Sequence, residues 1–274
     1  MLIETLSTFP HMYDSVMGES MMKRAQEKGI LEFRAHDLRD WTHDRHRTTD
    51  DDPYGGGAGL VMKCDPIFEA VEAILGKEFV EAKLAAAPPQ GESQQRSSAA
   101  PQIVFLAPQG RPFDDAYADQ LAAADHLLFI CGHYEGIDER VYALADHVIS
   151  LGDYVLTSGE LASMVVIDAA VRKLPGVLGA AEGPVDESFT SGLLEYPQYT
   201  RPADFRGMVV PEVLTSGNHA AIARWRREQS LARTASARPD LIAAAEAAGR
   251  LTPADQKFLK LLEPAPTGAA EGVS

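Results

Sequence analysis

The first two thirds of the chain alternate between short apolar runs and longer stretches that have apolar residues at helical spacing. The runs that are typical of buried strands are 2–6, 30–35, 102–106, 127–131 and 147–151. The stretches that predict helices are 10–28, which stops at Gly29, one that begins at Pro66, and 114–124, 137–145 and 159–174. Strands that alternate with helices favour an α/β fold in which a parallel sheet carries helices on both faces.

Two segments interrupt this pattern. Residues 85–101 are rich in Ala, Pro, Gln and Ser without an apolar period, which is typical of a flexible surface insert. Residues 179–190 contain glycines and a proline, and alanine-rich segments after them predict helices. We therefore expect an α/β domain over 1–178, an interdomain linker over 179–190, and a small, mostly helical domain over 191–274 with a frayed end.

The charge of the chain is unevenly distributed. The formal net charge of −15 argues against nonspecific adhesion to nucleic acid, yet residues 191–260 hold ten Lys and Arg against seven Asp and Glu. In this segment Arg224, Arg226 and Arg227 surround Trp225. Such a cluster is either a solvated helix face or a surface that binds RNA through stacking and phosphate contacts.

The cysteines and the apolar runs indicate where the protein works. Cys64 and Cys131 suit a reducing compartment, and neither lies at a metal-ligand spacing. The sequence has no run of 18 apolar residues and no basic region followed by an apolar stretch at its N-terminus. We expect a soluble, cytoplasmic protein with no membrane partner and no metal held by its own side chains.

Three segments of unusual composition follow predicted strands, namely 106–110, 131–140 and 151–160. Because the carboxyl ends of parallel strands meet at one edge of an open sheet, we expect these turns to lie together. Their glycines let backbone groups approach a flat ligand such as adenine, and Tyr154 and Leu156 are suited to cover its faces. Each turn alone is explained by ordinary turn chemistry, but three at adjacent strand ends favour a ligand pocket.

A second glycine-rich feature spans 53–62. It lacks the glycine spacing of a dinucleotide fingerprint and the lysine position of a phosphate loop. The segment 42–47, Thr-His-Asp-Arg-His-Arg, places hydrogen-bond donors shortly before it. One interpretation is a surface loop without a ligand, and the other is a nucleobase pocket with phosphate-contacting side chains.

The segment 188–202, Ser-Phe-Thr-Ser-Gly-Leu-Leu-Glu-Tyr-Pro-Gln-Tyr-Thr-Arg-Pro, is neither periodic nor apolar enough to belong to a core. The carboxylates of Asp186 and Glu187 precede it, and Pro197 and Pro202 restrict its backbone. A segment of this kind is better suited to hold a ligand than to fill a core.

These segments, in this order, resemble the bacterial tRNA (guanine-N1) methyltransferases, which belong to the SPOUT class. The resemblance covers about Met1 to Leu262 apart from the insert at 85–101. It implies a deep trefoil knot in the first domain, with S-adenosylmethionine bound in a bent conformation within that knot. The resemblance implies as well that magnesium can assist methyl transfer. It also implies a homodimer whose active site is shared between subunits, and a tRNA substrate with guanosine at position 37, just 3′ of the anticodon.

The resemblance, together with the turns described above, assigns roles to individual residues. Those that would bind the cofactor are Leu106, Pro108, Gln109, Gly110, Gly132, Tyr134, Glu135, Leu151, Gly152, Asp153, Tyr154, Val155, Leu156 and Ser158. Those that would bind the RNA are His46, Arg47, Asp50, Tyr54, Ala58, Gly59, Arg201, Trp225 and Arg226. Asp50 would contact the base or the backbone of its own loop.

Methylation at N1 of guanine requires a base that removes the N1 proton, and a carboxylate with a pKa raised by partial burial suits this step. By resemblance, the base stands directly before Ser-Phe, which is the place of Glu187, 15 residues after Arg172. The family has an aspartate at that place, and Asp186 stands one residue earlier, so both carboxylates are candidates. Arg172 either compensates a helix dipole or, by resemblance, stabilises the charge that develops on guanine O6.

Two other functions stay open at this point. The first is a SPOUT methyltransferase with another RNA target, against which the preserved segments 54–59 and 188–202 count. The second is a noncatalytic tRNA-binding protein that retains the fold, which would be expected to lose the acid or Arg172.

Overall fold

The computed structural model describes residues 1–85, 99–178 and 187–262. The chain divides into two compact units, Met1–Gly183 and Pro184–Ser274, which we describe one at a time. Three segments lie outside the described residues, namely 86–98, 179–186 and 263–274. They include most of the predicted insert and most of the predicted linker, with Asp186.

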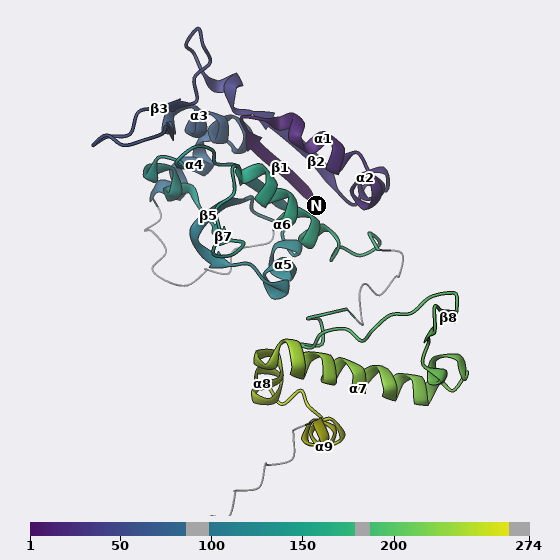
Figure 1. The fold of residues 1–274 in the computed structure, drawn as a ribbon. Helices are drawn as coiled ribbons and strands as arrows, with labels where there is room; N and C mark the ends of the chain where they lie inside the picture. The colour runs from purple at the N-terminus through teal and green to yellow at the C-terminus, as the bar shows by residue number, and fades with distance from the viewer. Residues whose placement is uncertain (86–98, 179–186, 263–274) are drawn as a thin grey trace, which may run out of the picture. The chain divides into compact units, whose positions relative to one another are not determined.

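The first unit is built on a sheet of parallel strands (Figure 1). Its members are β1 (Leu2–Ser7), β2 (Glu32–Asp37), β5 (Gln102–Pro112), β6 (His126–Ile130) and β7 (His147–Ser150). They stand in the order β2-β1-β6-β5-β7, and each neighbouring pair is parallel. The predicted parallel α/β fold is therefore confirmed, whereas the trefoil knot stays a prediction.

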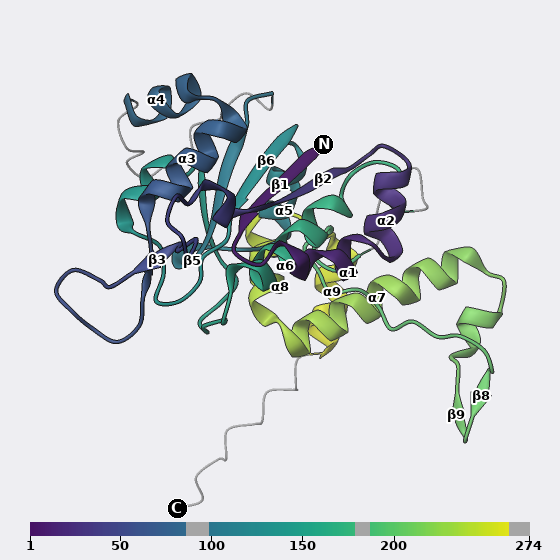
Figure 2. The same ribbon diagram turned by 90° about the horizontal axis from the view of Figure 1, so that it is seen from above.

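Helices cover both faces of this sheet (Figure 2). Along β6, Leu127 and Phe129 enter one apolar core while Leu128 and Ile130 enter the other, as the period of two in a strand requires. The elements on the first face are η1 (Pro10–Tyr13), α1 (Asp14–Met17), α2 (Ser20–Glu27), α5 (Asp115–Ala122) and α6 (Gly159–Val171). Those on the second face are η2 (Leu38–Trp41), α3 (Cys64–Leu75), α4 (Lys77–Ala85) and η3 (Glu139–Leu144).

Two predicted helices differ from the structure. The stretch 10–28 is not one helix, because the chain turns at Gly18 and Glu19 is extended, with φ −128° and ψ 162°. A Cβ atom on residue 18 would lie 2.6 Å from the carbonyl oxygen of Asp14, so the turn requires glycine. The stretch 137–145 is a short 3-10 helix, η3, whose first turn is capped by the Asp138 side chain.

Strand β5 is longer and less regular than the predicted run 102–106. It pairs with β7 as far as Leu106, and Arg111 then returns to pair with the same partner, Ile149. The residues between them leave the ladder as a loop. At the end of this loop, a Cβ on Gly110 would lie 2.5 Å from backbone atoms of Ile149, so only glycine lets the chain rejoin the sheet there.

An antiparallel ribbon, β3 (Asp50–Asp51) with β4 (Val61–Met62), carries the glycine-rich loop of the first unit. Ala58 in that loop is flanked by glycines with positive φ: 147° at Gly57 and 88° at Gly59. These values lie where residues with a side chain are strained, which explains the run of glycines.

The second unit is mostly helical, as predicted. Its elements are the hairpin β8 (Asp204–Phe205) and β9 (Met208–Val209), then η4 (Glu212–Thr215), α7 (His219–Ala237), α8 (Pro239–Ala247) and α9 (Pro253–Leu262). The unit has a small core, in which Leu231 of α7 meets Leu193, Ala245 and Leu251. The segment after Leu193 runs back along α7, because Leu194 donates its N–H to Thr234 at 2.9 Å and the Tyr199 ring meets Trp225 further along.

Candidate active site

Three loops, one that interrupts β5 and two that follow β6 and β7, line one cavity of about 310 Å³ in the first unit. The loops are 106–109, 132–137 and 149–159. They meet because adjacent parallel strands end at the same edge of the sheet. A volume of this size suits a small organic ligand.

The residues predicted to bind the cofactor line this cavity, apart from Gly110 and Asp153. Gly110 lies behind it, against the backbone of Ile149. Sequence reasoning missed His133, Glu139 and Tyr142, which also line it. The one signal for His133 was its place inside the turn between two glycines, Gly132 and Gly136.

Two glycines set the shape of the cavity wall. Gly159, the first residue of α6, donates its N–H to the carbonyl of Gly132 at 2.8 Å. A Cβ on Gly159 would lie 2.6 Å from the nitrogen of Gly132, so a larger residue would push α6 away from the end of β6. The close approach brings the N-terminus of α6 to the cavity.

Ser158 supplies an unsatisfied hydroxyl to the same wall. The residue is 7% exposed, lines the cavity and precedes α6, but its Oγ atom has no hydrogen-bond partner in the part of the chain that the structure describes. Buried polar atoms almost always have a partner. The hydroxyl is therefore a group that a polar ligand would satisfy.

The charges around the cavity favour a cationic or neutral ligand. Its lining residues include the carboxylates of Glu135 and Glu139 and, within the described chain, no lysine or arginine. Tyr154 and Tyr134 add ring surfaces that are about half exposed, 58% and 49% respectively. Tyr134 has φ 58°, a strained conformation that is common where a side chain is held for a ligand.

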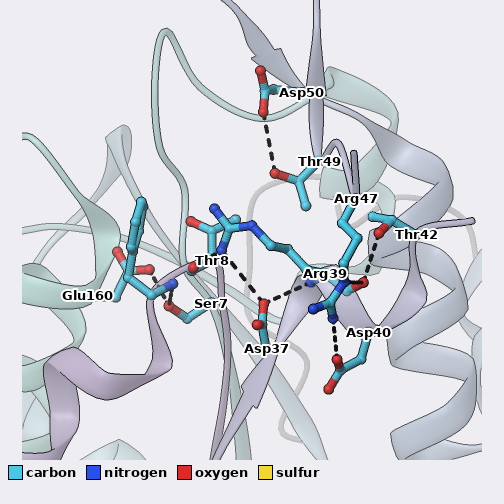
Figure 3. Close-up of polar contacts among 11 residues, drawn as sticks. Ser7, Thr8, Asp37, Arg39, Asp40, Thr42, Arg47, Thr49, Asp50 and Glu160 are labelled. Atoms are coloured by element: carbon cyan, nitrogen blue, oxygen red, sulfur yellow. Dashed lines mark hydrogen bonds and ion pairs between the residues drawn. The ribbon is translucent and has the colours of Figure 1, made fainter. Parts of the chain in front are cut away.

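A buried polar network supports the floor of the cavity. Glu160 is fully buried, and one of its carboxylate oxygens lies 2.6 Å from His133 Nε2. The other oxygen accepts a hydrogen bond from Ser7 (Figure 3). Nearby, the hydroxyl oxygen of Tyr13 lies 3.1 Å from Sγ of Cys131. Burial raises the pKa of the Cys131 thiol to about 12, and it raises the pKa of the Tyr13 phenol as well.

The glycine-rich loop is fastened to the cavity through backbone hydrogen bonds. Glu135 donates its N–H to the carbonyl of Leu60 at 3.1 Å, and Met62 donates to Gly136 at 2.9 Å. A Cβ on Gly59 would lie 2.5 Å from the side chain of Glu135. The loop predicted to hold a base and the loop predicted to hold the cofactor are therefore joined at Glu135 and Gly136.

Asp50 lies at this junction as well. Burial raises the pKa of the Tyr134 phenol, and the charge and hydrogen bond of the neighbouring Asp50 carboxylate raise it further. Thr49 donates a hydrogen bond to the same carboxylate at 3.4 Å (Figure 3).

The donors of the segment 42–47 are partly used within the fold. Arg47 forms an ion pair with Asp40 and donates to the carbonyl of Arg39 at 3.2 Å (Figure 3). Arg39 in turn donates to the carbonyl of Thr8 and lies over the Phe9 ring, with its Cζ 5.2 Å from the ring centroid. By contrast, Tyr54 in the glycine-rich loop is fully exposed.

The three residues predicted to carry the chemistry lie in different parts of the chain. Arg172 is the C-cap of α6 and donates its N–H to the carbonyl of Asp168 at 3.1 Å. Glu187 belongs to the second unit, directly before the turn in which Ser188 Oγ accepts the N–H of Glu195 at 2.9 Å. Asp186 lies outside the described residues, and the roles of all three stay predictions.

Neither a membrane span nor a metal cluster is found in the residues described. No helix among them is long and apolar enough to cross a membrane. In the same ranges, no group of three or more His, Cys, Asp or Glu side chains is placed to hold a metal ion.

The sheet and the cavity at its carboxyl edge define an α/β protein with a ligand-sized cavity between strand-end loops. The family described as tRNA (Guanine-1)-methyltransferase TrmD matches residues 1–244, and the chain belongs to this family, which is part of the SPOUT superfamily.

Curated relatives match almost the whole chain. A tRNA (guanine-N(1)-)-methyltransferase of Limosilactobacillus reuteri is 51% identical over 246 residues, which cover 90% of this chain and 91% of the relative. One of Symbiobacterium thermophilum is 51% identical over 260 residues, 95% of this chain and 97% of the relative. One of Moorella thermoacetica is 49% identical over 261 residues, 95% and 96% of the two chains. The predicted family is thus confirmed.

Proposed function

We propose that this protein transfers a methyl group from S-adenosylmethionine to N1 of guanosine 37 in tRNA, next to the anticodon. The observation that carries the proposal is the junction at Glu135, where the ligand cavity and the glycine-rich loop are joined by backbone hydrogen bonds. Methyl transfer requires a donor pocket and a base pocket side by side, because the reacting atoms must approach to about 3–3.5 Å.

The cavity suits S-adenosylmethionine. Its ring surfaces and backbone groups would hold the adenine, the unsatisfied hydroxyl of Ser158 would take a polar group of the ligand, and the carboxylate of Glu135 would favour its positive charge. When bound, S-adenosylmethionine supplies a methyl group on a sulfonium, which is open to attack by a nucleophile.

Glu187 is our choice for the residue that removes the N1 proton of guanine. Loss of this proton leaves a lone pair on N1 and spreads negative charge to O6. The guanidinium of Arg172 would stabilise that charge. Asp186 is the rival base, because it is adjacent in sequence and has the same chemistry.

We further propose that two copies of the chain form a homodimer and share the active site. Support comes from apolar side chains that the first unit leaves exposed: Leu161 and Val165 one turn apart on α6, and Val155 in the loop that lines the cavity. A second copy would cover them, and a face of this kind pairs with itself across a two-fold axis. The proposed work on tRNA places the protein in the cytoplasm.

The test is incubation with labelled S-adenosylmethionine and unmodified tRNA that carries either G or A at position 37. We expect label only in the G37 transcript, and 1-methylguanosine after digestion to nucleosides. Label in both transcripts would indicate another RNA target, and label in neither would indicate a noncatalytic protein. Parallel reactions with magnesium and with a chelator test whether the ion assists.

A further inference from the structure

The second unit contains a cavity of its own, of about 410 Å³. It lies between the extended segment that begins at Tyr196 and the N-terminal half of α7. Three aromatic residues line it, Tyr196, Tyr199 and Trp225. A cavity of this size admits a nucleotide.

The aromatic rings are held in place while part of their surface stays open. The Tyr199 and Trp225 ring centroids are 6.3 Å apart with an interplanar angle of 53°, and Tyr199 is 49% exposed. On the other side, Arg226 lies over the Tyr196 ring, with its Cζ 4.8 Å from the ring centroid. Aromatic rings with accessible faces are the groups on which unpaired bases stack.

The charge of the cavity is opposite to that of the chain. Its lining includes Arg201 and Arg226 and, among the residues described, no aspartate or glutamate, although the chain as a whole carries −15. Neither guanidinium has an ion pair with a carboxylate in the part of the chain that the structure describes. The lining therefore combines stacking surfaces with two positive charges.

The neighbouring arginines of α7 are neutralised. Arg224 pairs with Glu228 at 2.8 Å, and Arg227 binds both oxygens of Asp255, at 3.0 and 2.9 Å. The cluster around Trp225 is therefore not a uniform basic face. Of its three arginines, Arg226 alone lines the cavity.

We propose that this cavity binds one unstacked nucleotide of a single-stranded RNA segment, with the base on the Tyr199 and Trp225 rings and a flanking phosphate at Arg201 and Arg226. The choice of RNA as the ligand rests on the proposed function. Phosphate alone would not use the three aromatic rings, and a neutral peptide would not use the two guanidinium groups. A nucleotide uses both.

The fluorescence of Trp225 tests this proposal directly, because the full-length chain has two tryptophans and a Trp41→Phe variant leaves Trp225 as the only reporter. The probes are a single-stranded RNA heptamer, the same heptamer with abasic residues, and inorganic phosphate. We expect the intact heptamer to quench Trp225 in a saturable way, and the abasic strand and phosphate to leave its emission unchanged.

Matched variants in the same background separate the cavity from general charge. Tyr199→Ala, which removes a stacking surface, and Arg226→Ala, which removes a charge-assisted phosphate contact, should each weaken heptamer binding by about tenfold. Arg224→Ala removes the same charge two residues away, where Glu228 already neutralises it, and should change binding less than about twofold. Equal losses for Arg224→Ala and Arg226→Ala would overturn the proposal, as would equal quenching by the abasic strand.

Failure of this proposal is distinguishable from failure of the proposed function. Methylation of G37 tRNA without quenching of Trp225 by RNA would overturn the proposed nucleotide site but support the proposed methyltransferase function. Quenching without methylation would support the nucleotide site and contradict the proposed methyltransferase function. If Trp225 emission instead changes on dilution of the protein without RNA, a second copy of the chain fills the cavity, and the proposal is wrong.

Discussion

His133 and Glu160 form a hydrogen-bonded pair, 2.6 Å between Nε2 and Oε2, that joins the turn after β6 to the first turn of α6. Both elements line or adjoin the ligand cavity, and Ser7 of β1 completes the contact by donating to the second carboxylate oxygen. A carboxylate in the first turn of a helix is favourable because the N–H groups there are positive. The pair thus fixes one wall of the cavity to the sheet.

The first prediction follows from the burial of this carboxylate. Glu160→Ala leaves His133 and Ser7 without their common partner inside the protein, and it should lower the free energy of unfolding by about 3–5 kcal/mol. Glu160→Gln keeps an oxygen for Ser7 and should cost less. Urea unfolding measures both. Glu228→Ala, which breaks an exposed ion pair with Arg224, is the control and should cost less than about 1 kcal/mol.

The second prediction separates ligand binding from folding at Ser158. Its hydroxyl has no partner among the described residues, so Ser158→Ala should leave the free energy of unfolding unchanged or slightly higher. If a ligand takes that hydroxyl, the same change should weaken S-adenosylmethionine binding by about three- to tenfold. Calorimetric titration and urea unfolding give the two quantities.

Thr5→Val is the matched control for Ser158. Thr5 Oγ1 is also buried without a partner in the described chain, but Thr5 does not line the cavity. This variant should stabilise the protein without a change in affinity. If Ser158→Ala and Thr5→Val bind the ligand equally well, the hydroxyl of Ser158 has no part in binding.

The third prediction concerns the junction between the two loops. Gly59 and Gly29 both have positive φ, 88° and 67°, so alanine at either position should cost about 1 kcal/mol of folding free energy. Only at Gly59 does the new Cβ meet a neighbour, because it would lie 2.5 Å from Glu135, whereas Gly29 has open space around it. Gly59→Ala should therefore raise the KM for tRNA or lower kcat, and Gly29→Ala should change neither. Equal steady-state rates for the two variants would mean that the junction does not control the reaction.

The sequence predicted the strands and the cavity better than it predicted the helices of the N-terminal half. Apolar runs such as 127–131 are fully buried on two faces, so their pattern is unambiguous, and they also fixed where the turns would meet. The break at Gly18 was missed because the apolar period continues across it, and the 3-10 form of η3 was missed because a segment of six residues is too short for its period to be distinguished from that of an α-helix.

Long-range pairs were beyond what the pattern could give. The contact between Ser7 and Glu160 joins residues that are 153 positions apart, and neither residue type predicts the other. For the same reason the arginines of α7 looked alike in sequence. Glu228, the partner of Arg224, lies four residues away on the same helix, whereas Asp255, the partner of Arg227, lies on α9 and became visible only when the helices were packed.

The fourth prediction is a loss of stability at alkaline pH. Burial holds the pKa of Cys131 at about 12 against an ordinary value of 9.0, and raises that of Tyr13. Because both groups ionise more readily in the unfolded chain, their contribution to stability is complete below about pH 9 and is lost as the pH rises from there toward 12. Unfolding free energies measured from pH 7 to 11 should fall over the upper part of this range.

Cys131→Ala identifies the source of that slope. The variant should start less stable at pH 7 because it leaves a small cavity, but its stability should fall less steeply above pH 9 than that of the parent. Cys64→Ala, at a partly exposed position, should run parallel to the parent. Parallel curves for all three proteins would show that Cys131 is not the titrating group.

The fifth prediction decides which carboxylate removes the proton from guanine. Glu187 is the residue proposed as the base, so Glu187→Ala should lower single-turnover methyl transfer by about 10²- to 10⁴-fold, as loss of a general base does. Asp186→Ala should cost much less. Glu187→Gln keeps the shape and hydrogen-bonding ability of the side chain but accepts no proton, so it should be as slow as alanine while tRNA binding is unchanged. If Glu187→Ala keeps near-full turnover and Asp186→Ala abolishes it, Asp186 is the base, and the assignment of Glu187 is wrong.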